Sequence, residues 1–384
     1  MRRHLLVTND FPPKIGGIQN YLWELWRRLP EGAASVYTTP HSGTAAFDVV
    51  QPFPIERSPE PWLIPYPWLA ARVRKMVRAT ETELVLFDPA IPVGAIGPSL
   101  GLPYGVVLHG AEVTIPGRVQ PAKQILAKTL RSASLVVSAG QYALDEAERC
   151  AGRPLPSVVV PPGVDAQRFA PAAPERRRET RQRYGVADNE VLVATVSRLV
   201  PRKGMETLIL AAAELARRLA TNGPEFHVVI GGSGRQASDL SQLVERTGAP
   251  VQLPGRLSDQ EVVDLYGAAD LMAMLCNERW FGLEQEGFGI AFLEAAAAGL
   301  AQVAGRSGGA HEAVVHDVTG IIVDNPTDVT AAADALERLI REPETRSKMG
   351  IAARQRAVEQ FGYDALALRL QDAINRAELR VSTD

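Results

Sequence analysis

The chain has 384 residues, of which 46% are hydrophobic, and its formal net charge at pH 7 is -3. This length and composition suit two domains with hydrophobic cores of their own, and the nearly balanced charge gives no reason to expect nucleic acid as a partner. The two cysteines, Cys150 and Cys276, form no disulfide framework and have no metal-ligand partners at useful spacing, so we expect a reducing, cytoplasmic location.

The first half of the chain alternates short apolar runs with helical patterns. The apolar run at 4–7 is too short to be the core of a secretion signal or to cross a bilayer. It therefore predicts a buried strand and no transmembrane segment. A helix is expected over 17–29, where Ile18, Leu22, Leu25 and Leu29 share one face. Further strands are predicted at 34–38, 84–87, 104–108, 134–138 and 157–160. This alternation indicates a parallel α/β sheet that is covered on both faces.

Two predicted strands of this half end in polar residues that are candidates for a site. Asp10 follows the first strand in the segment NDFPPKIGG, and His109 follows a later strand in VVLHGAE. Strand ends of this kind face the ligand crevice in parallel α/β sheets. Gly16 and Gly17 allow the backbone to approach a ligand at a helix start. The alternatives are an ordinary glycine turn and a histidine that is merely packed and hydrogen-bonded.

After a connection rich in Pro, Ala and Arg at 161–190, the alternation starts again. Strands are predicted at 191–197, 226–230, 302–304 and 321–323, and helices at 204–218 and 329–341. The pattern is typical of a second doubly wound domain. A last helix over 363–378 fits either domain.

Arg198 and Lys203 flank the segment SRLVPRKG, directly after a strand and at a helix start. Two fixed cations beside free backbone N–H groups would neutralise a diphosphate, although a basic surface turn is the simpler alternative. Arg202 is expected to be solvated. Gly232 opens a loose dinucleotide-binding pattern, but no acidic residue ends a strand about 20 positions later, so a nicotinamide site is disfavoured.

The segment EGFGIAFLEAAAAG places two carboxylates at a turn and on a short helix. Ile290 to Ala298 is predicted to be helical and to end at Gly299, with Glu286 in the turn before it and Glu294 on its second turn. Free N–H groups at the start of such a helix suit hydroxyls and phosphate oxygens, but two solvated glutamates on an amphipathic helix remain an alternative. Ser307-Gly308-Gly309 is predicted to form another N–H donor loop near the Glu286 turn.

The sequence contains no Asp-x-Asp pair that would hold a divalent ion against a diphosphate, so no metal site is predicted. Arg198, Lys203 and helix ends would then carry the positive charge. The segment PEPWLIPYPWL, with Trp62, Tyr66 and Trp68, precedes the basic stretch ARVRKMVR. These aromatics and cations suit an anionic membrane surface, whereas core aromatics beside solvated charges are the alternative.

The motifs together resemble the retaining glycosyltransferases of family 4 over nearly the whole chain, and in particular the actinobacterial GDP-mannose-dependent α-mannosyltransferases that act on phosphatidylinositol mannosides. The resemblance rests, in chain order, on NDFPPKIGGIQ, VVLHGAE, PPGVD, SRLVPRKG, VVIGGSG, ADLMAML, EGFGIAFLE, GRSGGAHEAV and VTGIIV.

The resemblance implies a GT-B fold, with two Rossmann-like domains facing each other across a deep cleft. Residues 1–165 would form the acceptor-side domain, completed by the C-terminal segment 363–384, and residues 166–362 the nucleotide-sugar domain. The acceptor side would use Asp10 and Gln19. The catalytic residues would be His109, Arg198, Lys203 and Glu286. The nucleotide sugar would contact Gly16, Gly17, Arg198, Lys203, Gly232, Val251, Arg256, Glu286, Phe288, Gly289, Ile290 and Glu294.

The implied function is metal-independent transfer of mannose from GDP-mannose to a phosphatidylinositol mannoside-type lipid, with retention by front-face attack. No cofactor is expected. The protein would be cytoplasmic or peripheral on the inner face of the plasma membrane. The alternatives are a family 4 transferase with another nucleotide sugar and a soluble acceptor, a nucleotide-sugar epimerase, and a non-catalytic nucleotide-sugar binder.

Overall fold

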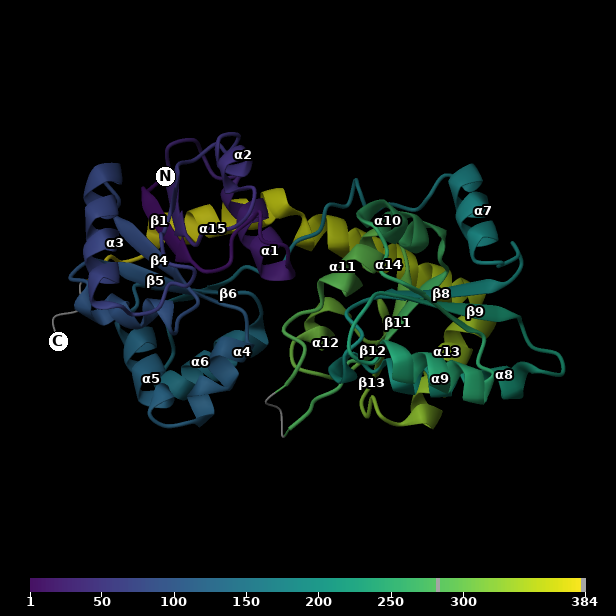
Figure 1. Cartoon of the computed structure of the whole chain (residues 1–384). Helices are drawn as coiled ribbons and strands as arrows, with labels where there is room; N and C mark the ends of the chain where they lie inside the picture. Colours follow the sequence, from purple (N-terminus) through teal and green to yellow (C-terminus); the bar gives the residue numbers. More distant parts are fainter. Residues whose placement is uncertain (281–283, 381–384) are drawn as a thin grey trace. The chain divides into compact units, whose positions relative to one another are not determined.

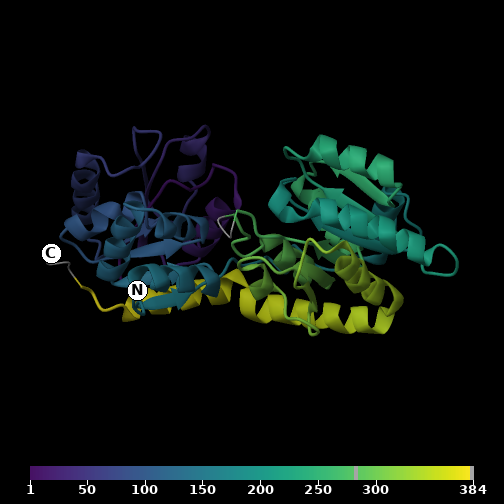
Figure 2. The same ribbon diagram turned by 90° about the horizontal axis from the view of Figure 1, so that it is seen from below.

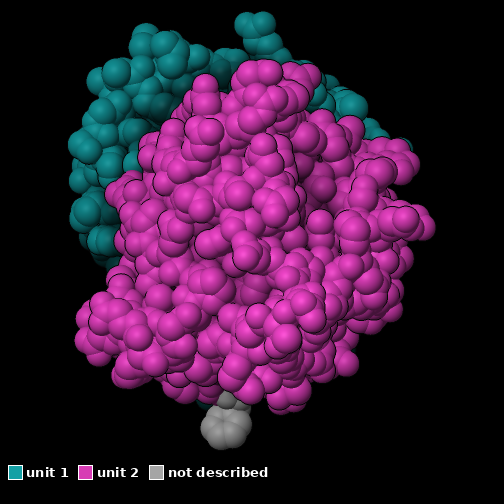
Figure 3. Space-filling model, turned by 90° about the vertical axis from the view of Figure 1, so that its right-hand side faces the viewer, with its two compact units in different colours: residues 1–162, 363–384 teal, residues 163–362 magenta. Residues whose placement is uncertain are grey.

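The computed structural model describes residues 1–280 and 284–380 and divides the chain into two compact units (Figures 1 and 3). Unit 1 comprises Met1–Pro162 and Tyr363–Asp384, and unit 2 comprises Gly163–Gly362. Residues 381–384 of the predicted C-terminal segment lie outside the described residues. Among those described, no helix is both long and apolar enough to span a membrane.

The core of unit 1 is a seven-stranded sheet in which every neighbouring pair is parallel, in the order β3-β2-β1-β4-β5-β6-β7. The strands are β1 (His4–Thr8), β2 (Ala34–Thr38), β3 (Ile55–Arg57), β4 (Leu84–Asp88), β5 (Tyr104–Leu108), β6 (Leu135–Ser138) and β7 (Ser157–Val159). Around them lie α1 (Gly17–Trp26), α2 (Thr44–Asp48), α3 (Pro67–Thr80), α4 (Ala111–Thr114), α5 (Ala122–Ser132), α6 (Gln141–Ala151) and α15 (Tyr363–Arg376), with 3₁₀ turns at Val93–Ser99 and Pro116–Arg118.

Both faces of this sheet are buried, which is why its strands are continuous apolar runs. Alternate residues of a strand point to opposite faces, so Leu5 and Val7 join the core cluster beneath α3 and α5, whereas Leu6 joins the cluster that contains α1 and α15. Helix α15, which follows unit 2 in the sequence, lies along unit 1 (Figure 2) and inserts Leu366, Leu370 and Ile374 into that second cluster.

Unit 2 has a six-stranded parallel sheet in the order β10-β9-β8-β11-β12-β13. Its strands are β8 (Val191–Val196), β9 (Phe226–Gly231), β10 (Val251–Gly255), β11 (Leu271–Met274), β12 (Ala301–Gly305) and β13 (Gly320–Val323). Its helices are α7 (Pro174–Arg183), α8 (Met205–Leu219), α9 (Ala237–Thr247), α10 (Asp259–Ala268), α11 (Ile290–Ala297), α12 (Ala310–Ala313), α13 (Val329–Arg341) and α14 (Pro343–Phe361), with a 3₁₀ turn at Pro201–Lys203. The predicted α/β class with two parallel sheets is confirmed.

The strand order reverses once in each sheet, between β1 and β4 in unit 1 and between β8 and β11 in unit 2. The loops that leave the carboxyl ends of such strands turn away from each other and leave room for a ligand. Each unit therefore has one edge position at which a site is expected.

Replacing Leu370 by Ala tests whether α15 belongs to the core of unit 1. Leu370 is fully buried, so its truncation is expected to lower the free energy of unfolding by about 2–5 kcal/mol. The matched control is Leu368→Ala on the same helix, where the side chain is 61% exposed, and a change below about 0.5 kcal/mol is expected. Urea unfolding followed by tryptophan fluorescence suits the measurement, because four of the five tryptophans belong to unit 1: Trp23, Trp26, Trp62 and Trp68. Equal losses of unfolding free energy in the two variants would show that α15 does not stabilise unit 1.

Candidate functional site

The carboxyl edge of the unit 2 sheet carries a buried ion pair at the reversal of strand order. Lys203, in the turn after β8, places its Nζ 2.8 Å from Oε2 of Glu286, which lies in the segment between β11 and α11. Both residues are only 8% exposed. The structure thus brings together two predicted site residues that are 83 positions apart in the sequence.

The turn that carries Lys203 is fixed against the segment after β11. Gly204 has φ +67°, and a Cβ atom there would lie 1.9 Å from the carbonyl oxygen of Leu275, so only glycine permits this approach. Asn277 donates its N–H to the carbonyl of Arg202 at 2.9 Å and its Nδ2 to the carbonyl of Pro201 at 3.3 Å. The Lys203 side chain is therefore held in place by backbone contacts.

The surroundings of Glu286 favour its ionised form. Burial alone would raise its pKa, but the charges of Lys203 and Arg202 outweigh burial and lower the pKa. Arg202 is half-buried, with its Nε 3.9 Å from Oε2, so the expectation of a solvated side chain was wrong. Cys276 also contacts Oε2, through Sγ at 3.8 Å, and burial raises the pKa of this thiol to about 12.

One oxygen of the Glu286 carboxylate is left for a ligand. The contacts with Lys203, Arg202 and Cys276 are all made by Oε2, and Oε1 has no polar partner among residues 1–280 and 284–380. A carboxylate oxygen is a hydrogen-bond acceptor, so this atom can accept from hydroxyl groups. The arrangement suits a polyhydroxylated ligand beside a fixed positive charge.

The loop that contains Ser307, Gly308 and Gly309 anchors Glu286. Gly309 donates its N–H to the carbonyl of Glu286 at 2.9 Å, and Ser307 Oγ accepts the Glu286 N–H at 3.4 Å. A Cβ atom at Gly308 would lie 2.3 Å from the Glu286 carbonyl oxygen. This loop was expected to offer N–H donors, and at Gly309 the donor is already in use.

Helix α11 begins beside Glu286 and presents backbone donors. Gly289 precedes it with φ +88°, and the N–H groups of Phe288, Gly289 and Ile290 have no acceptor among the described residues. The positive end of the helix dipole adds to these donors, so hydroxyl or phosphate oxygens are favoured there. The helix ends as predicted, with left-handed Gly299 donating its N–H to the Ala296 carbonyl.

Glu294, on the second turn of α11, is half-buried, and its carboxylate has no hydrogen bond or ion pair with any residue that the structure describes. Burial raises its pKa to about 7, although Arg168 partly opposes the shift. A carboxyl group in this state accepts hydrogen bonds better once it has lost its proton. Ligand hydroxyls would therefore favour ionisation of Glu294.

The other predicted residues of unit 2 lie at different places around β8, β9 and β10. Arg198 is exposed after β8 and makes no ion pair with the part of the chain that is described. Gly232 donates its N–H to the Gly255 carbonyl at 2.7 Å, so this donor is used within the protein. Arg256 is exposed directly after β10, whereas Val251 begins that strand, about 16 Å away along it, at the opposite edge of the sheet.

The carboxyl edge of unit 1 carries a second polar cluster, which contains the predicted residues Asp10 and Gln19. Oδ1 of Asp10 accepts hydrogen bonds from Lys14 Nζ at 2.7 Å and from Gln19 Nε2 at 2.5 Å. The Asp10 N–H donates to Thr8 Oγ1 at 2.8 Å. Gly16 and Gly17 lie at the start of α1, directly before Gln19.

His109 lies at the same edge and is held by a residue that the sequence analysis did not identify. Its Nε2 donates to Oδ1 of Asp88, at the end of β4, over 2.6 Å, while Thr8 Oγ1 donates to the other Asp88 oxygen at 2.5 Å. Burial alone would lower the pKa of His109, but Asp88, Glu112 and Asp10 together raise it to about 8. The signal for Asp88 was its place at the end of the apolar run LVLF.

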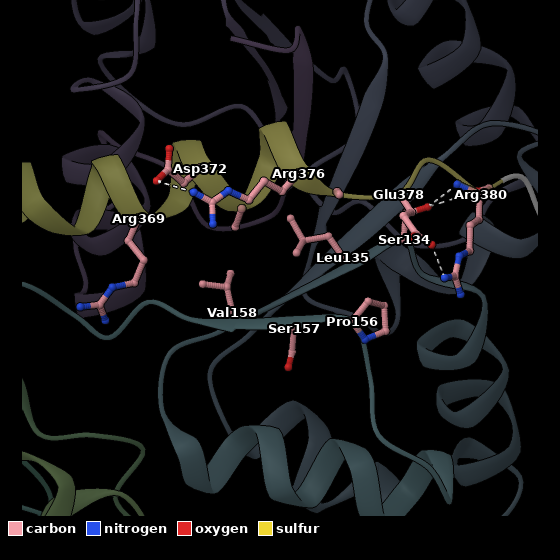
Figure 4. A pocket seen from close by; sticks show the side chains of 12 residues that line it. Ser134, Leu135, Pro156, Ser157, Val158, Arg369, Asp372, Arg376, Glu378 and Arg380 are labelled. Carbon is pink, nitrogen blue, oxygen red and sulfur yellow. Dashed lines mark hydrogen bonds and ion pairs between the residues drawn. The ribbon is translucent and has the colours of Figure 1, made fainter.

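A surface groove of about 570 Å³ lies at the opposite, amino-terminal edge of the unit 1 sheet (Figure 4). It is lined by the starts of β6 and β7 and by α15, and it contains none of the predicted site residues. Among residues 1–280 and 284–380, no group of three or more His, Cys, Asp or Glu side chains is arranged to hold a metal ion.

Comparison with known proteins gives matches along nearly the whole chain. Residues 15–168 match the family described as "Glycosyltransferase Family 4", and residues 176–356 match "Glycosyl transferases group 1". The chain is 35% identical to a GDP-mannose-dependent alpha-(1-6)-phosphatidylinositol monomannoside mannosyltransferase of Mycobacterium tuberculosis, with 97% of this chain and 98% of the relative covered. It is 34% identical, with the same coverage, to a GDP-mannose-dependent monoacylated alpha-(1-6)-phosphatidylinositol monomannoside mannosyltransferase of Corynebacterium glutamicum.

Among solved structures, HepE of Anabaena in complex with UDP and glucose superimposes with a TM-score of 0.77. The superposition covers 97% of this chain and 100% of that chain at 24% sequence identity. At this level of identity the likeness is evidence for the fold alone.

Lys203→Met is expected to destabilise the protein because it leaves the buried Glu286 carboxylate without its nearest cation. Removing one partner of a buried pair costs about 3–5 kcal/mol, and the double variant Lys203→Met/Glu286→Gln should recover much of this loss. The control is Arg198→Met, since Arg198 is exposed, and less than about 0.5 kcal/mol is expected. Urea unfolding followed by circular dichroism measures all three variants. Similar losses of unfolding free energy for Lys203→Met and Arg198→Met would contradict a structural role for the ion pair.

Glu294→Gln is expected to stabilise the protein at pH 8 but not at pH 5. The pKa of Glu294 is raised from 4.5 to about 7, so its contribution to stability is complete below pH 4.5 and is lost as the pH rises to about 7. Gln resembles the protonated carboxyl group and does not ionise, so the difference from the parent should grow across this range. Thermal unfolding at pH 5, 6, 7 and 8 gives the comparison, with Glu245→Gln at an exposed position of α9 as the control. A difference that does not vary with pH would be inconsistent with a raised pKa.

Proposed function

Since the chain belongs to the group 1 and family 4 glycosyltransferases, we propose that it transfers mannose from GDP-mannose to a phosphatidylinositol mannoside-type lipid. The predicted family, the GT-B fold and the assignment as a glycosyltransferase are confirmed. The donor and the acceptor are proposed from the names of two relatives that are 34–35% identical over nearly their full lengths. The structural observation that carries the proposal is the Lys203–Glu286 pair with its unpartnered carboxylate oxygen.

The donor would bind at the carboxyl edge of unit 2. Oε1 of Glu286 would accept hydroxyls of the transferred sugar, and the N–H groups at the start of α11 would donate to sugar or phosphate oxygens. Lys203 and the exposed Arg198 would neutralise the diphosphate, with half-buried Arg202 as a third cation. Glu294 would accept the ribose hydroxyls, and the base would lie near Arg256 rather than near Val251, which is at the other end of β10.

These residues suit the departure of a nucleoside diphosphate. As the bond between the anomeric carbon and the phosphate oxygen lengthens, negative charge accumulates on the diphosphate and positive charge on the sugar ring. Lys203 and Arg198 would stabilise the first charge without a metal ion. Retention would follow front-face attack, in which the departing phosphate accepts the proton of the acceptor hydroxyl.

The lipid acceptor is supported by an aromatic and basic surface on unit 1, which we name the α3 surface and define by Trp62, Trp68, Arg74, Lys75 and Arg78. Trp62 and Trp68 are 60% and 47% exposed, so the alternative of core aromatics does not apply to them. The three cations lie along α3 and line a shallow groove of about 500 Å³. Lys75 and Arg78 are exposed, whereas Arg74 is half-buried and donates to the carbonyls of Ser99 and Leu100. Exposed indole rings and exposed cations on one segment favour an anionic membrane surface, where we place the acceptor-bound enzyme.

Calorimetric titration with GDP, UDP and ADP tests the donor assignment. GDP is expected to bind at least about tenfold more tightly than UDP or ADP, equally well in chelator and in Mg²⁺, because protein cations hold the phosphates. Tighter binding of UDP or ADP would exclude GDP-mannose as the donor, while the assignment as a glycosyltransferase would stand. A need for Mg²⁺ would contradict metal-independent binding.

A transfer assay with a phosphatidylinositol mannoside in vesicles then tests the reaction itself. Glu286→Gln is expected to lower kcat/KM about 100-fold or more while GDP still binds, because the nucleotide does not carry the sugar that Glu286 contacts. Glu245→Gln is the matched control. Full activity of Glu286→Gln would remove this residue from the proposed site.

A further inference from the structure

The polar cluster of unit 1 contains a carboxylate that the proposed function does not yet use. Asp88 is 1% exposed, and both of its oxygens are occupied, one by His109 Nε2 and the other by Thr8 Oγ1. We infer that Asp88 is a positioning residue that keeps the His109 imidazole doubly protonated and its Nδ1–H directed at an electron-rich oxygen of the substrate. This inference rests on the proposed transferase function, in which such an oxygen is present.

The position of Asp88 follows from the strand order. Strands β4 and β5 are parallel neighbours with Phe87 opposite Val106, so Asp88 and His109 leave the same edge side by side. The distance of 2.6 Å between Oδ1 and Nε2 is that of a short, charge-assisted hydrogen bond. A buried carboxylate with such a partner favours the cationic imidazole, because otherwise its own charge would lie unpaired in the core.

Three further side chains face His109 from the elements around it. Glu112, on α4, accepts the backbone N–H groups of His109 and Gly110, and Asp10, after β1, adds a second nearby carboxylate. Tyr21, on α1, places its ring edge-on with centroids 5.6 Å apart. Its hydroxyl donates to the Val160 carbonyl, so it does not compete for the imidazole. Lys14 adds a further positive charge to this cluster, and its Nζ is paired with Asp10.

The imidazole thus has one occupied nitrogen and one free nitrogen. Nε2 is bound to Asp88, whereas Nδ1 has no hydrogen-bond partner among the residues that the structure describes, and the side chain is 12% exposed. In the doubly protonated ring both nitrogens are donors, so Nδ1–H has a proton to give to a ligand oxygen. The raised pKa of about 8 agrees with this geometry. A neutral imidazole would offer a weaker donor and no charge.

Asp88→Asn and nuclear magnetic resonance provide the first test. Histidine ring signals of the full-length protein are followed against pH, and His109→Gln identifies the His109 signal among the six histidines. His109 is expected to titrate near pH 8 in the parent and at least about one pH unit lower in Asp88→Asn, since burial remains and only Glu112 and Asp10 still oppose it. The control is Ser138→Ala, a buried polar residue at the end of β6 whose hydroxyl donates to the Gly140 carbonyl. An unchanged titration in Asp88→Asn would overturn the inference.

The pH profile of mannosyl transfer provides the second test. At pH 8, Asp88→Asn is expected to lose about tenfold or more in kcat/KM, because few of its His109 rings are charged, and the loss should be smaller at pH 6. His109→Gln should lose activity at both pH values, and the double variant should be no worse. An equal loss at pH 6 and pH 8 would indicate a merely structural role for Asp88 and overturn the inference. If GDP-mannose proves not to be the donor, the resonance titration still decides the protonation of His109, so the two proposals fail separately.

Discussion

A carboxylate that is taken out of water must be paired or protonated, and this constraint governs the arrangement around Glu286. The pairing cation, Lys203, comes from the other side of the reversal in strand order, so the ion pair joins the loops after β8 and β11. Gly204 lets the turn after β8 approach Leu275, and Gly308 and Gly309 let the loop after β12 approach the segment that carries Glu286. Packing and electrostatics therefore fix a carboxylate whose second oxygen remains available.

The polar clusters at the two sheet edges are electrostatic opposites. In unit 2, the cations Lys203 and Arg202 surround one carboxylate, whereas in unit 1 the carboxylates Asp88, Glu112 and Asp10 surround one imidazole. Each cluster lies where its sheet reverses strand order, although the two sequences differ. The shared feature is the topology, and the difference in charge decides what each edge can do to a substrate.

Most of the fold could be predicted because parallel strands that are buried on both faces are continuous apolar runs, as at 104–108 and 191–196. Helix α14 was not predicted, since few of its side chains are buried and its polar sequence has no strong periodicity. The predicted site residues Lys203 and Glu286 do meet. Three features were missed because they depend on which strands become neighbours. They are the contact of Asp88 with His109, the burial of Arg202, and the hydrogen bond that occupies the Gly232 N–H. Strand order is a property of the folded sheet, which local sequence patterns do not contain.

The return of the chain to unit 1 through α15 has a consequence for synthesis on the ribosome. Residues 1–162 emerge first, but Leu366, Leu370 and Ile374 of their core emerge only after all of unit 2. Unit 2 is a single continuous segment and can finish folding as soon as Gly362 has left the exit tunnel. Until α15 has emerged as well, the apolar surface of α1 and the strands that α15 covers remains exposed to water. The nascent chain therefore completes its first-made unit last, and its need for chaperone protection is greatest in that interval.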